Sequence, residues 1–349
     1  MTNEDQRITW VDSLKGFAII CVVIGHVIKG SMDAGMYTNC SSWMHDIYNG
    51  IYTFHMPLFI VISGFLFNLA YVKGTQFNTK LNESSYKKQI LNLAILYVAY
   101  SVLMGLSKMV LSGAVNEKIT IKDILMIWAK PIQLYWYLYI LLIFYVIFSN
   151  SFFRNSRHYV LILLTLFAIS VISSFIHFSS WFQLYRISYY SFYFYLGNKL
   201  SEIIKIPTVR TIGAVTSTIS LVLVYIYWDR NYYIVDTPGI NSVIALGLVC
   251  ILIFIFSKNV ILQRSKFLSM CGRYNLEIYL LHSYFATINR VLLRKINMNN
   301  GILAIILSSI LSLFMPILLS YIAKRINLFQ IMFKPYYFIH NRLTKTKQI

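Results

Sequence analysis

The chain has 349 residues, of which 58% are hydrophobic and only 12% are charged. Soluble domains contain about 25% charged residues, so this composition excludes an ordinary soluble protein and indicates a membrane protein with several spans. The formal net charge is +19, but the basic residues are spread over short segments between apolar stretches. This distribution does not favour a nucleic acid as a partner. It is typical of cytoplasmic loops that contact anionic membrane lipids.

About ten apolar stretches are close to the roughly 20 residues that a membrane-spanning helix needs. The stretch at 182–200 is the least typical, because it is aromatic and polar rather than aliphatic. The sequence therefore predicts an all-α, polytopic membrane helix bundle of about ten transmembrane helices. The predicted spans lie at 10–29, 51–72, 90–111, 132–149, 159–176, 182–200, 209–228, 240–257, 274–293 and 302–323.

The basic residues predict the orientation of these spans. With the N-terminus in the cytoplasm, the predicted inner segments hold 20 Lys and Arg residues and the predicted outer loops hold 7. This bias alternates from loop to loop, so we expect a multi-pass protein of the cell membrane with both termini in the cytoplasm. We expect one transmembrane domain over residues 1–330 and a basic cytoplasmic tail over 331–349.

The first predicted span carries three ionisable residues, Asp12, Lys15 and His26. Lys15 and His26 are eleven residues apart, so they lie within about 20° on one helix face, and Asp12 lies near that face. Ionisable groups inside a bilayer cost about 2.5–3.5 kcal/mol each and usually face a polar cavity. Imidazole titrates near neutral pH, so His26 is a candidate general base, whereas Lys15 could attract an anion and Asp12 could pair with Lys15. The alternatives are a packing role for His26 and snorkelling of Lys15 to the headgroups.

The second and fourth spans add candidates. His55 lies near the predicted outer end of its span, at a depth similar to that of His26. Ser63 precedes Gly64, and this small pair suits either a site or ordinary close packing of helices. Trp136 lies toward the outside of the fourth span, where an aromatic belt is the alternative to a site.

The sixth and ninth spans contain further ionisable groups. Arg186 is followed by tyrosines at helical spacing, which suits recognition of a sugar or phosphate, or a buried cation satisfied by phenols. Glu277 should face a polar cavity, because no local partner is evident. His282 has either a direct role or a structural hydrogen bond between helices. The four cysteines are scattered, and we expect no metal site.

Together these segments resemble the membrane acyltransferase 3 family, whose members O-acetylate cell-surface carbohydrates. The resemblance rests on Lys15, ten intervening residues and His26; on FHMPLFIVISGFLF; on Trp-Tyr-Leu from Trp136; and on IYLLH, which ends at His282. The family more often has arginine where Lys15 stands, and lysine supplies charge without a bidentate fork. The segment Asp-Ser-Leu-Lys-Gly is similar to the fucose 4-O-acetylase-like branch.

The resemblance implies that residues 1–330 form an acyltransferase domain. It would move an acetyl group from cytoplasmic acetyl-CoA to a hydroxyl of a cell-surface or precursor carbohydrate, with no bound cofactor. Acetyl-CoA, the carbohydrate and membrane lipids are the expected partners. Succinyl transfer, and a transient acyl group on His26 in place of general-base catalysis, stay open. We expect His26, Lys15 and His55 to be catalytic, and Asp12, Ser63, Trp136, Arg186, Glu277 and His282 to bind substrate.

The main alternative is a transporter or flippase for a glycan or small solute. Buried ionisable residues in a helix bundle also suit proton coupling. Many transporters, however, have inverted repeats, and none is visible between the two halves of this chain.

Overall fold

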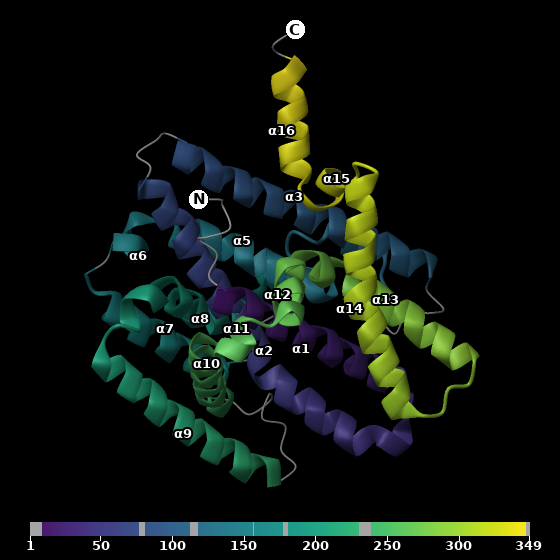
Figure 1. The fold of residues 1–349 in the computed structure, drawn as a ribbon, viewed down its shortest axis with the longest axis horizontal. Coiled ribbons are helices and arrows are strands. Elements are labelled where there is room, and N and C mark those ends of the chain that lie inside the picture. The colour runs from purple at the N-terminus through teal and green to yellow at the C-terminus, as the bar shows by residue number, and fades with distance from the viewer. Residues whose placement is uncertain are drawn as a thin grey trace. The chain divides into compact units, whose positions relative to one another are not determined.

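The computed structural model describes residues 9–76, 81–111, 118–155, 157–176, 181–229 and 239–346. Over these ranges the regular elements are all helices, and none is a strand (Figure 1). The predicted all-α class is therefore confirmed.

Among the described helices, six are long and apolar enough to cross a membrane. They coincide with predicted spans one, two, three, seven, eight and ten, so the prediction of a membrane helix bundle is confirmed. These helices are α1 (Thr9–Asp33), α2 (Ser41–Gln76), α3 (Leu81–Val110), α9 (Pro207–Asp229), α10 (Ile240–Lys258) and α14 (Gly301–Arg325).

The other four predicted spans also coincide with helices, but each departs from a typical span. The apolar helices α5 (Trp136–Phe148) and α7 (Tyr159–Ser173) have only 13 and 15 residues. The helices α8 (Leu184–Ile203) and α13 (Asn275–Lys295) have 20 and 21 residues, and both carry charged side chains near their ends. The count of ten spans and the cytoplasmic position of the termini stay predictions.

The chain divides into two compact units, and each combines segments that are distant in the sequence. The first unit contains residues up to 59 together with 206–320, and the second contains 60–205 together with the residues from 321 onward. The first unit therefore holds α1, α9, α10, α13, the short helices α11 (Val260–Gln263) and α12 (Lys266–Arg273), the start of α2 and most of α14. The second holds α3, α5, α7, α8 and the short helices α4 (Ile121–Leu125), α6 (Ser151–Asn155), α15 (Phe329–Phe333) and α16 (Pro335–Thr346).

The segment predicted as a basic tail packs on α3 within the second unit. The hydroxyl of Tyr100 donates to the carbonyl of Met332 at 3.3 Å, and the backbone N–H of Tyr336 donates to Oδ1 of Asn92 at 3.2 Å. These bonds attach the beginning of the predicted tail to a long helix. The domain boundary at residue 330 itself stays a prediction.

In the first unit, α1 and α12 cross with their backbones in direct contact. A Cβ atom on Gly16 would lie 1.9 Å from the carbonyl oxygen of Leu268, and one on Gly272 would lie 1.8 Å from that of Asp12. Ser13 and Ser269 place their hydroxyl oxygens 3.2 Å apart at the same crossing. Small residues allow this approach, as is usual for helices that pack inside membranes. The crossing fixes the part of α1 that carries Asp12 and Lys15.

The second unit contains an equivalent crossing between α2 and α8. A Cβ atom on Gly64 would lie 2.0 Å from the carbonyl oxygen of Phe194, and one on Gly197 would lie 1.9 Å from that of Val61. Gly64 therefore packs against a neighbouring helix, which is one of the two roles that the sequence left open for Ser63-Gly64.

The α9 helix has one face that packs on α10 and another that is apolar and exposed. The hydroxyl of Ser220 donates to the carbonyl of Val243 at 2.9 Å, and that of Ser217 donates to the carbonyl of Gly247 at 3.3 Å, so the side of α9 that carries these serines faces α10. The exposed side carries large aliphatic residues such as Ile212 and Val215. Exposed apolar surface on a helix of this length suits contact with lipid.

The predicted orientation can be tested at Cys40, a half-exposed free thiol in the short 3₁₀ turn Thr38–Cys40 that precedes α2. If the N-terminus is cytoplasmic, Cys40 lies outside, and a membrane-impermeant thiol reagent should label it in intact cells. Cys40→Ser is the control for the site of labelling. Labelling that requires permeabilised cells would reverse the orientation.

The α1–α12 crossing predicts that Gly16→Ala destabilises the protein by about 1–3 kcal/mol, because the added methyl meets backbone that cannot move aside without separating the helices. Gly213→Ala is the matched control: it lies within α9 and no atom is within 4 Å of the added Cβ. Thermal unfolding of the purified variants in detergent measures both effects. Equal midpoints for the two variants would contradict the described crossing.

Candidate active site

Three predicted site residues gather in the first unit around one tyrosine. His26 of α1 and His282 of α13 have ring centroids 5.2 Å apart. Tyr52 of α2 places its hydroxyl 3.4 Å from Nδ1 of His26, and its ring centroid is 4.6 Å from that of His55. We call these four residues the histidine cluster. Residues far apart in the chain, on three helices, thus lie close together.

The backbone determines which nitrogen carries the proton in two of these histidines. Nδ1 of His282 lies 2.9 Å from the carbonyl oxygens of both Ile278 and Tyr279, and Nδ1 of His55 lies 2.8 Å from that of Ile51. A carbonyl oxygen only accepts hydrogen bonds, so Nδ1 is the donor in both rings. In the neutral form of each ring, Nε2 therefore carries a lone pair.

His282 is fully buried, and its Nε2 has no hydrogen-bond partner among the described residues. Buried polar atoms are nearly always hydrogen-bonded, and leaving one unpaired costs about 1–3 kcal/mol. A structural role would be complete with the bonds from Nδ1. The lone pair on the buried Nε2 is thus a hydrogen-bond acceptor without a donor among the described residues.

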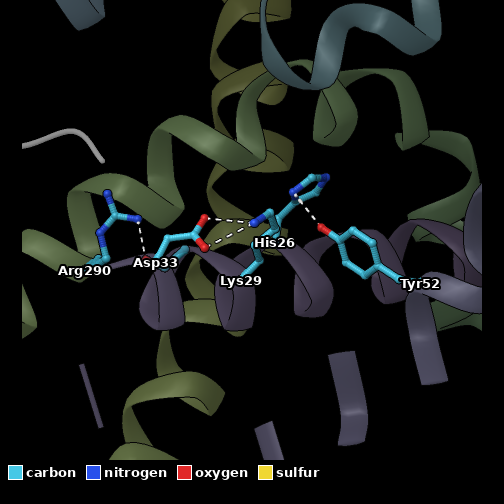
Figure 2. A network of polar contacts seen from close by, with 6 residues as sticks. His26, Lys29, Asp33, Tyr52 and Arg290 are labelled. Carbon is cyan, nitrogen blue, oxygen red and sulfur yellow. Dashed lines mark hydrogen bonds and ion pairs between the residues drawn. The ribbon is translucent and has the colours of Figure 1, made fainter. Parts of the chain in front are cut away.

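A polar network joins α1 to α13 one turn beyond His26 (Figure 2). Nη1 of Arg290 donates to the carbonyl of Gly30 at 3.1 Å, and Lys29 forms an ion pair with Asp33 at 3.1 Å. A Cβ atom on Gly30 would lie 2.7 Å from Nη1 of Arg290, so a methyl group there would displace the guanidinium from its present position. The contacts follow the same order along both helices, so α1 and α13 run in the same direction. The predicted topology gives that direction to spans one and nine.

Asp12 and Lys15 lie toward the beginning of α1 and form an ion pair of 2.7 Å. Their side chains are only 10% and 14% exposed. Pairing lowers the cost of burying both charges, as the sequence suggested. Eleven residues separate Lys15 from His26, which corresponds to about 16 Å along the helix axis. Glu277 is buried in the first turn of α13, where the helix dipole favours a negative charge.

The remaining predicted residues lie in the second unit. The guanidinium carbon of Arg186 is 4.5 Å from the ring centroid of Trp136. The rings of Trp136 and Tyr190 are stacked, with centroids 5.5 Å apart and planes inclined by 22°. Arg186 also donates a hydrogen bond to Gln183. We call Trp136, Arg186 and Tyr190 the arginine–aromatic stack. Such a planar surface can recognise a sugar ring or an anionic group, and cation–π contacts stabilise it.

Ser63 does not belong to this stack. Its hydroxyl oxygen lies 2.7 Å from that of Tyr137, and both side chains are buried. This hydrogen bond gives each of the two buried hydroxyls a partner within the second unit.

Sequence reasoning missed Tyr52 and Tyr137. The chain contains 27 tyrosines, so tyrosine alone carries little information. The available signal was spacing: Tyr52 precedes His55 by three residues and therefore shares its helix face.

The described residues contain no group of three or more His, Cys, Asp and Glu side chains that could hold a metal ion.

Comparison with known proteins places these residues in a family. The sequence model of a family described as an acyltransferase domain matches residues 8–321, which is most of the chain. The chain belongs to the acyltransferase 3 family. All nine predicted site residues lie within the matched range.

A segment of 56 residues is 43% identical to the nodulation protein NolL of Sinorhizobium fredii (strain NBRC 101917 / NGR234). It covers 16% of this chain and 14% of that protein, so the similarity is local. No solved structure matches the chain. The domain match thus shows the family, whereas the roles of individual residues are proposals that rest on the geometry of this chain.

Proposed function

We propose that this acyltransferase moves an acetyl group from cytoplasmic acetyl-CoA to a hydroxyl of a cell-surface or precursor carbohydrate, with His26 as the general base. The observation that carries the proposal is the position of His26 in the histidine cluster of an acyltransferase 3 chain. An imidazole is well suited to remove a proton from a hydroxyl at neutral pH. The cell membrane is the proposed location.

In the proposed reaction, His26 takes the proton of the acceptor hydroxyl while the hydroxyl oxygen attacks the thioester carbonyl. A carbon–oxygen bond forms, the carbon–sulfur bond breaks, and the sulfur leaves as a thiolate. The imidazolium returns its proton to that sulfur, so the products are an ester and free CoA. His55 belongs to the same cluster, and we propose that it lines the path of the reacting groups.

The donor is polyanionic, and Lys15 is the proposed contact for one of its phosphates. Its ion pair with Asp12 keeps the ammonium in place in the absence of donor. A phosphate would have to compete with the Asp12 carboxylate, so Asp12 influences donor affinity in the opposite direction to Lys15. Glu277, buried near the same end of its own helix, is proposed to shape the polar surroundings of the donor.

The arginine–aromatic stack is the proposed carbohydrate-binding element of the second unit. Aromatic rings stack on the apolar faces of sugars, and Arg186 adds donors for hydroxyl or anionic substituents.

The general-base role predicts that His26→Ala lowers acyl transfer by about 10²–10⁴-fold, because the hydroxyl loses its proton acceptor. The measurement is the ester-linked acetyl content of surface glycans in cells that lack the protein and are complemented with either form. His158→Ala, which removes an exposed histidine at the start of α7, is the control. Equal amounts of each form in the membrane must be verified.

Restoration of the acetyl ester by wild type and by His158→Ala, but not by His26→Ala, is the expected result. Full activity of His26→Ala would remove the general-base assignment. An unchanged acetyl content with altered surface glycan or solute levels would favour a transporter. Appearance of succinyl esters would change the donor and keep the mechanism.

The donor-side role predicts opposite effects for the two members of the ion pair. Lys15→Ala should raise the KM for acetyl-CoA about tenfold or more, the equivalent of one lost charge-assisted hydrogen bond, and Lys15→Arg should keep it low. Asp12→Asn removes the competing carboxylate and should leave this KM unchanged or lower it. Release of CoA thiol by membranes that contain the endogenous acceptor measures all three. An unchanged KM in Lys15→Ala would contradict the assignment.

A further inference from the structure

We propose that His282 is a positioning residue for His26: its Nε2 accepts a hydrogen bond from Nε2–H of His26 and selects the tautomer in which Nδ1 of His26 is the base. This inference rests on the proposed function of His26. It replaces the expectation that His282 contacts substrate with a role that acts through another side chain.

His282 supplies the hydrogen-bond acceptor. The Nδ1–H of His282 is held by two carbonyl oxygens, so the ring can neither rotate freely nor change tautomer without losing these bonds. The lone pair on Nε2 is therefore fixed within a fully buried side chain and lacks a partner among the described residues. It needs a donor, and the histidine ring nearest to it is that of His26.

His26 supplies the hydrogen-bond donor. Nδ1 of His26 faces the Tyr52 hydroxyl at 3.4 Å (Figure 2). Nε2 is therefore the nitrogen of His26 that is available to His282. If Nδ1 carried the proton, the lone pairs of two Nε2 atoms would compete for the same buried space. With the proton on Nε2, His26 donates to His282, and its Nδ1 accepts from Tyr52 until the acceptor hydroxyl arrives.

The spacing of the two rings is compatible with this bond. A hydrogen bond of about 3 Å between the nitrogens of two imidazoles places their ring centres about 5 Å apart, and the observed separation is 5.2 Å with planes inclined by 42°. A modest rotation of the His26 ring completes the contact. Catalytic hydrogen bonds are often incomplete without substrate and tighten when it binds.

A neutral imidazole has an advantage as the orienting group in this location. Within the described part of the chain, His26 makes no ion pair with a carboxylate, and the nearby Asp33 is engaged by Lys29. A buried carboxylate would need its own compensation inside an apolar bundle. His282 orients the base without adding a charge, and it can share the positive charge that forms when His26 takes the proton.

The test uses two amides that imitate different nitrogens of His282. The amide of Gln reaches the position of Nε2, whereas the amide of Asn reaches that of Nδ1. We expect His282→Asn to lower kcat at least tenfold, with the KM for acetyl-CoA changed less than twofold. We expect His282→Gln to keep most of the activity, because its carbonyl oxygen can accept the bond from His26. CoA release by membranes with the endogenous acceptor is the assay.

A purely structural role predicts the reverse order, because Asn preserves the bonds to Ile278 and Tyr279 and Gln does not. Higher activity of the Asn variant would therefore overturn the proposal, as would equal activity of both variants and wild type.

A measurement on the wild-type protein covers the case in which both variants fail to fold. The ¹⁵N spectrum of histidine-labelled protein distinguishes the two neutral tautomers, and His26→Ala identifies the His26 signals by their loss. Protonation of His26 at Nε2 is expected, and protonation at Nδ1 would overturn the inference. A wild-type protein that releases no CoA would instead refute the proposed function, which separates the two failures.

Discussion

The structure depends on one constraint: an ionisable or polar side chain inside an apolar helix bundle must find its partner within the protein. Lys15 meets this constraint through Asp12, and Arg290 meets it through a backbone carbonyl of the neighbouring helix. Each partner lowers the cost of a buried charge and also restrains the helix that carries it. The same constraint makes the unpaired Nε2 of His282 significant, because a buried acceptor without a donor is rarely retained.

Close helix packing gives these side chains their positions. In the first unit, the Gly16–Gly272 crossing holds α1 against α12, and the Arg290–Gly30 contact holds the other end of α1 against α13. His26 lies between these two attachments, so its place is set by backbone contacts on both sides. Preorganisation of this kind suits acyl transfer, in which a base has to meet a hydroxyl at hydrogen-bond distance.

In the proposed mechanism, the histidine cluster and the ion pair of Asp12 and Lys15 divide the chemistry along α1. One end carries paired charges suited to an anionic donor, and the imidazoles lie about 16 Å farther along the axis, where a hydroxyl could be deprotonated. Backbone carbonyls of their own helices hold two of the imidazoles, and this fixes the tautomer of each ring without adding a charge. The arrangement is consistent with an acyltransferase that keeps its donor-binding and proton-transfer groups on one helix.

By itself, the sequence determined the membrane class, the helical fold and the face that Lys15 and His26 share, because hydrophobic length and helical periodicity are local properties. It also pointed to the family through motifs that lie in order along the chain. Only the tertiary structure decided that His26 and His282 are neighbours and that Tyr52 contacts both His26 and His55, because residues 26 and 282 meet through helix packing that no local pattern encodes. It likewise separated Ser63, which bonds Tyr137, from the arginine–aromatic stack of Trp136 and Arg186. The tautomers of His55 and His282 depend on carbonyls three or four residues earlier, yet the significance of the free Nε2 depends on which rings are packed around it.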